Sequence, residues 1–71
     1  MLLKDTRVGD RVYDEIGKIE GIVIKFDYNK PVNPSQEDYC VVVQVTDSMG
    51  SSSVGSTIEY SPYVEVSIIN H

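Results

Sequence analysis

Few side chains in this 71-residue sequence have the chemistry of a catalytic group. A covalent mechanism needs a nucleophile beside a base, and the single histidine, His71, is the last residue, where chain ends are poorly held. Two carboxylate pairs, Asp14-Glu15 and Glu37-Asp38, fall in predicted turns, where carboxylates are normally solvated. A general acid would need a pKa raised by burial. The sequence therefore predicts a protein that is not an enzyme.

Metal and cofactor sites also lack their usual spacing. Cys40 is the single cysteine, so it can complete neither a zinc ligand set nor a redox CxxC pair, and we expect it to be a small buried hydrophobe. The stretch DSMGSSSVG at residues 47–55 precedes no predicted helix and offers one carboxylate among serines. It matches neither a phosphate loop nor a calcium loop. We predict no metal and no cofactor.

Five tyrosines are more than the core of so small a domain can enclose. Tyrosine suits interfaces because it joins apolar area to a polar tip. We expect Tyr28, Tyr39 and Tyr60 in the core or at its rim, and Tyr13 and Tyr63 in contacts with a partner. With nearby acids and one loop methionine, the predicted partner-binding residues are Tyr13, Asp14, Glu15, Met49, Glu59, Tyr63 and Glu65.

Charge is divided unevenly along the chain. The formal net charge is −5, and all six lysines and arginines come before Pro31. The later part holds five acids, which predicts an acidic face and a basic protein partner. Nucleic-acid binding is disfavoured because phosphate affinity depends on clustered cations. The alternative RNA surface would place Tyr13 or Tyr28 beside the cations Arg11, Lys18, Lys25 and Lys30.

The elements that must position these residues are short strands. Apolar residues alternate with polar ones and do not recur at helical spacing over a useful length, which predicts one all-β domain over residues 1–71. The segment from Asn29 to Asp38 contains Pro31 and Pro34 and predicts an ordered, partly extended loop, and residues 47–55 predict a second loop. The predicted strands are Asp10–Tyr13, Ile19–Tyr28, Tyr39–Thr46, Thr57–Tyr60 and Val64–Ile69.

Glycines and alternation give finer expectations for the second strand. Gly21 inside it predicts a bulge, a bend or the close approach of another backbone. Gly17 in the preceding turn is expected to supply a positive φ. The predicted core face of this strand carries Ile22, Ile24, Phe26 and Tyr28.

Two further elements follow from the later part of the chain. The strand from Tyr39 to Thr46 is apolar on both faces and should lie between other strands. Ser61-Pro62 predicts a short 3₁₀ turn before the last strand, because proline lacks an amide and fixes φ.

Four short motifs are GDRV (Gly9 to Val12), GIV (Gly21 to Val23), YCVVV (Tyr39 to Val43) and YSPYVEV (Tyr60 to Val66). Together they resemble small SH3-like barrels, including KOW-type and Tudor-like domains and many short bacterial and phage proteins. The resemblance implies a strongly bent five-stranded barrel with a short helical turn before the last strand. In signalling SH3 domains, a tyrosine in a segment similar to SPYV helps to line a peptide groove.

The function favoured by these features is a non-catalytic protein-binding module or accessory subunit that uses an aromatic and acidic surface. One alternative is an acidic inhibitor, of the kind that phages encode, which occupies the nucleic-acid groove of a host enzyme. A second alternative is an RNA-binding barrel. Self-association through an unpaired sheet edge is left open.

A cytoplasmic location without membrane contact is expected. The longest apolar run, Cys40 to Val43, is far too short to cross a bilayer, and the first residues lack the pattern of a signal peptide.

Overall fold

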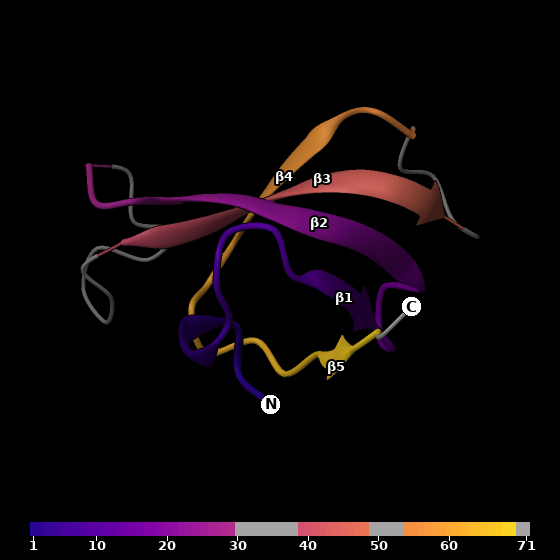
Figure 1. Ribbon diagram of the computed structural model, residues 1–71, viewed down its shortest axis with the longest axis horizontal. Coiled ribbons are helices and arrows are strands. Elements are labelled where there is room, and N and C mark those ends of the chain that lie inside the picture. The colour runs from indigo at the N-terminus through magenta and orange to yellow at the C-terminus, as the bar shows by residue number, and fades with distance from the viewer. Residues whose placement is uncertain (30–38, 49–53, 70–71) are drawn as a thin grey trace.

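Five antiparallel strands form one sheet in the computed structural model, which describes residues 1–29, 39–48 and 54–69 (Figure 1). Their order is β4-β3-β2-β1-β5, so β5 returns to lie beside β1. The all-β class and the number of strands expected from the sequence are confirmed. The strands are β1 (Arg11–Asp14), β2 (Ile19–Asp27), β3 (Cys40–Ser48), β4 (Thr57–Tyr60) and β5 (Ser67–Ile68).

β2 is the strand on which the sheet bends. Its pairing with β3 slips twice, between Glu20 and Gly21 and again after Val23. Such bulges kink a strand and increase its twist. A Cβ built on Gly21 would overlap the Val43 side chain and lie 2.6 Å from the carbonyl oxygen of Gln44. The predicted close approach of another backbone at Gly21 is therefore confirmed. The register slip beside it has its extra residue, Thr46, on β3.

The second bulge decides which side chains of β2 are buried. Ile24 has no partner in the β2–β3 ladder, so the residues after it change faces. Val23 and Phe26, three residues apart, consequently both contact the core. The predicted core face is correct for Phe26 but wrong for Ile24 and Tyr28, which are exposed, and Ile22 is only half-buried.

The core is small and consists mainly of valines. β3 lies between β2 and β4, and its residues from Cys40 to Val43 are all buried, as its apolar composition predicts. The Cys40 thiol is free and buried, which confirms its expected place in the core. The buried cluster at the centre is Leu3, Val12, Val23, Val41, Val43 and Val66.

Backbone hydrogen bonds hold the N-terminal residues against the segment that follows β4. Leu3 donates its amide to the carbonyl of Val64 at 2.9 Å, and Val66 donates to Met1 at 2.8 Å. The predicted strand Val64–Ile69 therefore pairs with β1 only over the two residues of β5. Its first half lies along the chain start instead.

The turn before β5 differs from the predicted 3₁₀ turn. A single bond, from the Val64 amide to the Ser61 carbonyl at 3.2 Å, closes it. One such bond makes a β-turn, whereas a 3₁₀ helix repeats the bond at successive residues. Within the described residues, the 3₁₀ helix is η1 (Leu3–Asp5), near the chain start.

The predicted loops are described only in part. β3 continues to Ser48, so the prediction that residues 47 and 48 belong to a loop is wrong. Val54 and Gly55 form a turn, as do Tyr28 and Asn29, whereas residues 30–38 and 49–53 lie outside the described residues. The described part of the chain contains no helix that is long and apolar enough to span a membrane.

Replacement of Gly21 by alanine should destabilise the fold by about 1–3 kcal/mol, because the new Cβ would force the two central strands apart. Urea unfolding followed by circular dichroism measures the change. The control is Lys25→Ala, on the same strand with an exposed side chain, which should change stability by about 0.5 kcal/mol or less. Equal midpoints for the two variants would contradict the close approach at Gly21.

Candidate functional site

The described residues do not bring the predicted partner-binding residues onto one surface. Glu15 and Glu65 line a single groove. Tyr13 and Glu59 each line a different hollow, the first beside the β1–β2 turn and the second over β3 and β4. Met49 lies outside the described residues. The remaining two residues, Asp14 and Tyr63, line none of these three hollows.

Asp14 is buried and holds the β1–β2 turn closed. Its Oδ1 accepts the backbone amides of Ile16 at 3.1 Å and Gly17 at 3.2 Å, and its Oδ2 accepts the Tyr60 hydroxyl at 3.2 Å. A Cβ on Gly17 would lie 2.6 Å from Oδ2, so a side chain there would displace the Asp14 carboxylate. The positive φ expected at Gly17 occurs at Lys18 instead, at 58°. Both Asp14 oxygens are thus engaged inside the molecule.

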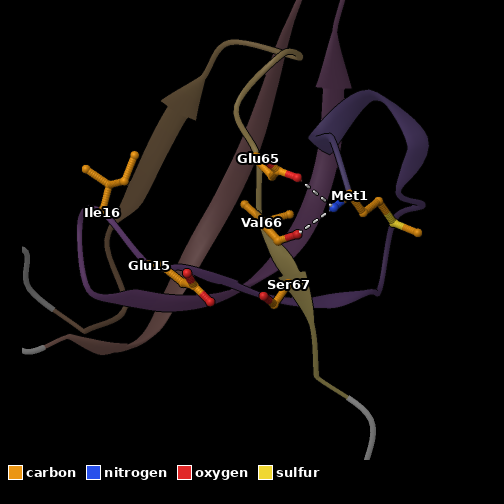
Figure 2. Close-up of a pocket in the computed structure, with 6 residues that line it drawn as sticks. All are labelled: Met1, Glu15, Ile16, Glu65, Val66 and Ser67. Atoms are coloured by element: carbon orange, nitrogen blue, oxygen red, sulfur yellow. Dashed lines mark hydrogen bonds and ion pairs between the residues drawn. The ribbon is translucent and has the colours of Figure 1, made fainter.

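Glu15 and Glu65 face a groove of about 360 Å³ between the β1–β2 turn and the segment that leads into β5 (Figure 2). Val66 forms a buried apolar part of it, and Ile16 is 94% exposed at its edge. The ammonium of Met1 donates to the Val66 carbonyl at 3.1 Å and pairs with Glu65 at 3.6 Å. The groove therefore combines carboxylates with apolar side chains.

Three aromatic rings pack together where β2 ends and β3 begins, and Tyr63, in the turn that follows β4, lies within electrostatic reach of Tyr39 among them. The Tyr39 ring is central, with its centroid 5.1 Å from that of Tyr28 and 6.2 Å from that of Phe26. Phe26 and Tyr39 pack against the core, whereas Tyr28 is 69% and Tyr63 57% exposed. We call Phe26, Tyr28, Tyr39 and Tyr63 the aromatic surface.

Tyr63 is near enough to Tyr39 for its charge to affect the pKa of the Tyr39 hydroxyl. Burial raises the pKa of the Tyr39 hydroxyl, and Tyr28, Tyr63 and Asp5 raise it further through their charge. These groups therefore lie within electrostatic reach of Tyr39. The ammonium of Lys4 lies 5.9 Å from the centre of the Tyr63 ring, a distance at which an aromatic face attracts a cation.

Sequence reasoning selected Tyr63 for partner contact but missed Tyr28, Tyr39 and Phe26. Tyr39 and Tyr60 are half-buried, as expected for rim positions, and the expectation of a core or rim position for Tyr28 is wrong. The sequence positions of two of these residues could have predicted that they lie close together, because Tyr28 directly follows β2 and Tyr39 directly precedes β3. Antiparallel neighbours bring such positions to the same end of the sheet.

Groups with catalytic or ligand chemistry are not clustered in the described part of the chain. No three side chains of histidine, cysteine, aspartate or glutamate converge there as metal ligands. The Cys40 Sγ lies 3.7 Å from Glu59 Oε2, and burial, followed by the charge of Glu59, raises the pKa of the thiol. A protonated thiol is a poor nucleophile, so Cys40 serves packing.

Comparisons of the chain with protein-family models, curated proteins and solved structures give no match.

The Tyr60 hydroxyl should make stability depend on alkaline pH. Burial, then the charge of Asp14 and its hydrogen bond, raise the pKa of Tyr60 to about 12. Since the unfolded hydroxyl ionises near its ordinary pKa of about 10, the stabilisation is complete below about pH 10 and is lost as the pH rises towards about 12. Tyr60→Phe should cost about 1 kcal/mol at neutral pH.

Urea midpoints of the wild type and Tyr60→Phe, measured at about pH 8 and about pH 11.5, test this linkage. The stability difference between the two proteins should shrink at the higher pH, because other titrating groups are common to both. A difference that stays constant or grows would contradict the role given to the Asp14–Tyr60 hydrogen bond.

Proposed function

We propose that this chain is a non-catalytic protein-binding module or accessory subunit, built on an SH3-like barrel, which docks a basic segment of a protein partner on its aromatic surface. The observation that carries the proposal is the exposed ring of Tyr28 packed against the anchored ring of Tyr39, with the exposed Tyr63 within electrostatic reach.

Curvature of the sheet supports the barrel. Tyr60 on the edge strand β4 donates its hydroxyl to Asp14 at the end of β1, although β2 and β3 lie between these strands in the sheet order. A flat sheet would keep the two residues several strand spacings of about 4.8 Å apart. Two bulges in the β2–β3 pair, one at Thr46 of β3 and one at Ile24 of β2, supply the bend that such closure needs.

The contact energy that aromatic side chains contribute at interfaces supports protein recognition on the aromatic surface. Aromatic side chains dominate the contact energy of many interfaces, because each buries a large area at a low cost in conformational entropy. Phe26 and Tyr39 pack against the core, so part of the surface is held in place before a partner arrives. The exposed rings of Tyr28 and Tyr63 remain available for burial.

Charge supports a basic partner. The chain carries a formal net charge of −5, and Asp5 lies within electrostatic reach of Tyr39. The Lys4 ammonium near the Tyr63 ring is an intramolecular example of the contact that an arginine or lysine of the partner would make. Aromatic faces and carboxylates favour the same class of ligand.

Affinity capture from cells of the native host, followed by mass spectrometry, tests the proposal. The variants Tyr28→Ala and Tyr63→Ala should each reduce recovery of the specific partner at least tenfold, since central aromatic contacts are worth about 2 kcal/mol or more. The matched control is Val54→Ala, which removes apolar area at a residue that is 65% exposed in the β3–β4 connection. A partner recovered equally by all four proteins would rule out the aromatic surface.

The salt dependence of that complex distinguishes the proposal from an acidic inhibitor of a nucleic-acid enzyme. Ring burial should preserve most of the capture between about 50 mM and about 500 mM salt, because apolar contacts are not screened, and only the contacts to basic side chains should weaken modestly. Steep loss of capture over the same range would instead favour the acidic mechanism. Retardation of single-stranded RNA at low salt would favour the RNA-binding alternative.

A further inference from the structure

We infer that the groove lined by Met1, Glu15, Ile16, Glu65, Val66 and Ser67, the turn groove, is a second docking site, which takes a lysine or arginine side chain from a basic segment of a protein partner. It shares no residue with the aromatic surface, so the inference stands on separate observations.

Ile16 is the first of these observations. It lies in the β1–β2 turn, where a polar residue would be expected, yet its side chain is almost entirely exposed. Figure 2 shows Ile16 at the margin of the groove, with Val66 on the segment opposite. An apolar side chain at the edge of a groove gains free energy when a ligand covers it.

The carboxylates are the second observation. Glu15 and Glu65 come from two segments far apart in the sequence and face the same groove (Figure 2). Glu65 already pairs with an ammonium group, that of Met1, at 3.6 Å. Among the described residues, no cation lies within ion-pair distance of Glu15, so one carboxylate remains for a ligand.

These two features together select the ligand class. Lysine and arginine carry a charged head on an apolar stem, and such a stem can pack on Ile16 while the head reaches Glu15. Anionic ligands, including nucleic acid, would be repelled by Glu15, whereas Glu65 is already paired with the Met1 ammonium. A second copy of this chain is disfavoured because it brings a formal net charge of −5 to an acidic groove.

Titration with a defined peptide tests the inference. The probe is a synthetic hexapeptide of alternating leucine and lysine with blocked ends, added to isotope-labelled protein while amide resonances are recorded by NMR. The amides of residues 15–17 and 65–67 should shift together. Glu15→Gln should weaken the dissociation constant about two- to fivefold, as expected for an exposed ion pair, and Ile16→Ser about tenfold.

Matched variants separate this site from the aromatic surface and from general charge. Glu59→Gln removes an exposed carboxylate from a different hollow and should leave the dissociation constant unchanged. Tyr28→Ala should also leave it unchanged, so failure of the turn groove and failure of the aromatic surface are distinguishable. Thermal unfolding of each variant confirms that the fold is retained.

Several results would overturn the inference. The first is a set of amide resonance shifts spread over acidic residues throughout the molecule. The second is an equal loss of peptide affinity in Glu15→Gln and Glu59→Gln. The third is a peptide affinity that Ile16→Ser leaves unchanged. Equal shifts with a hexapeptide of alternating leucine and glutamate would also do so, as would concentration-dependent shifts at residues 15–17 without peptide, which indicate a second copy of the chain.

Discussion

The close approach of β2 and β3 at Gly21 is the contact on which the rest of the molecule depends. A side chain at this position would overlap Val43 and the backbone of Gln44, so the hydrogen-bonded strands can meet there only because the residue is glycine. The adjacent slips in register bend β2 and bring β1 over the valines of β3. A core of so few side chains gives a small free energy of unfolding. A change at this contact would therefore remove a large fraction of that stability.

The same bend determines where the two candidate surfaces lie. Once the sheet curves, the end of β4 approaches the end of β1, and the Tyr60 hydroxyl reaches Asp14. That hydrogen bond and the two amides accepted by Asp14 hold the β1–β2 turn in place, which positions Ile16 and Glu15 beside the segment before β5. At the other end of β2, the second bulge turns Phe26 inward, where its ring supports Tyr39. The turn groove and the aromatic surface are therefore both consequences of how β2 bends.

Local patterns predict the strands because alternation is a property of neighbouring residues. Five strands, the buried Cys40 and the special role of Gly21 could be predicted from the sequence for this reason. The bulge at Ile24 could not, because nothing in the residue itself distinguishes a bulged isoleucine from a paired one. The predicted face is therefore wrong before the bulge, where Val23 is buried, and right after it, at Phe26. Tyr28 is exposed because it follows the last residue of β2 and lies in the turn. Tyr63 was selected because it lies at a strand end beside acids, and it is exposed there.

The tyrosines divide into roles according to what their hydroxyl groups meet. A core filled with valines is too narrow to enclose a phenol ring completely, so each tyrosine must carry its polar end to the rim. Tyr60 finds the Asp14 carboxylate there, and its ring becomes a structural brace between distant strands. Tyr39 is held by the rings on either side of it. Tyr28 and Tyr63 are mostly exposed, and the proposed partner recognition rests on that exposure.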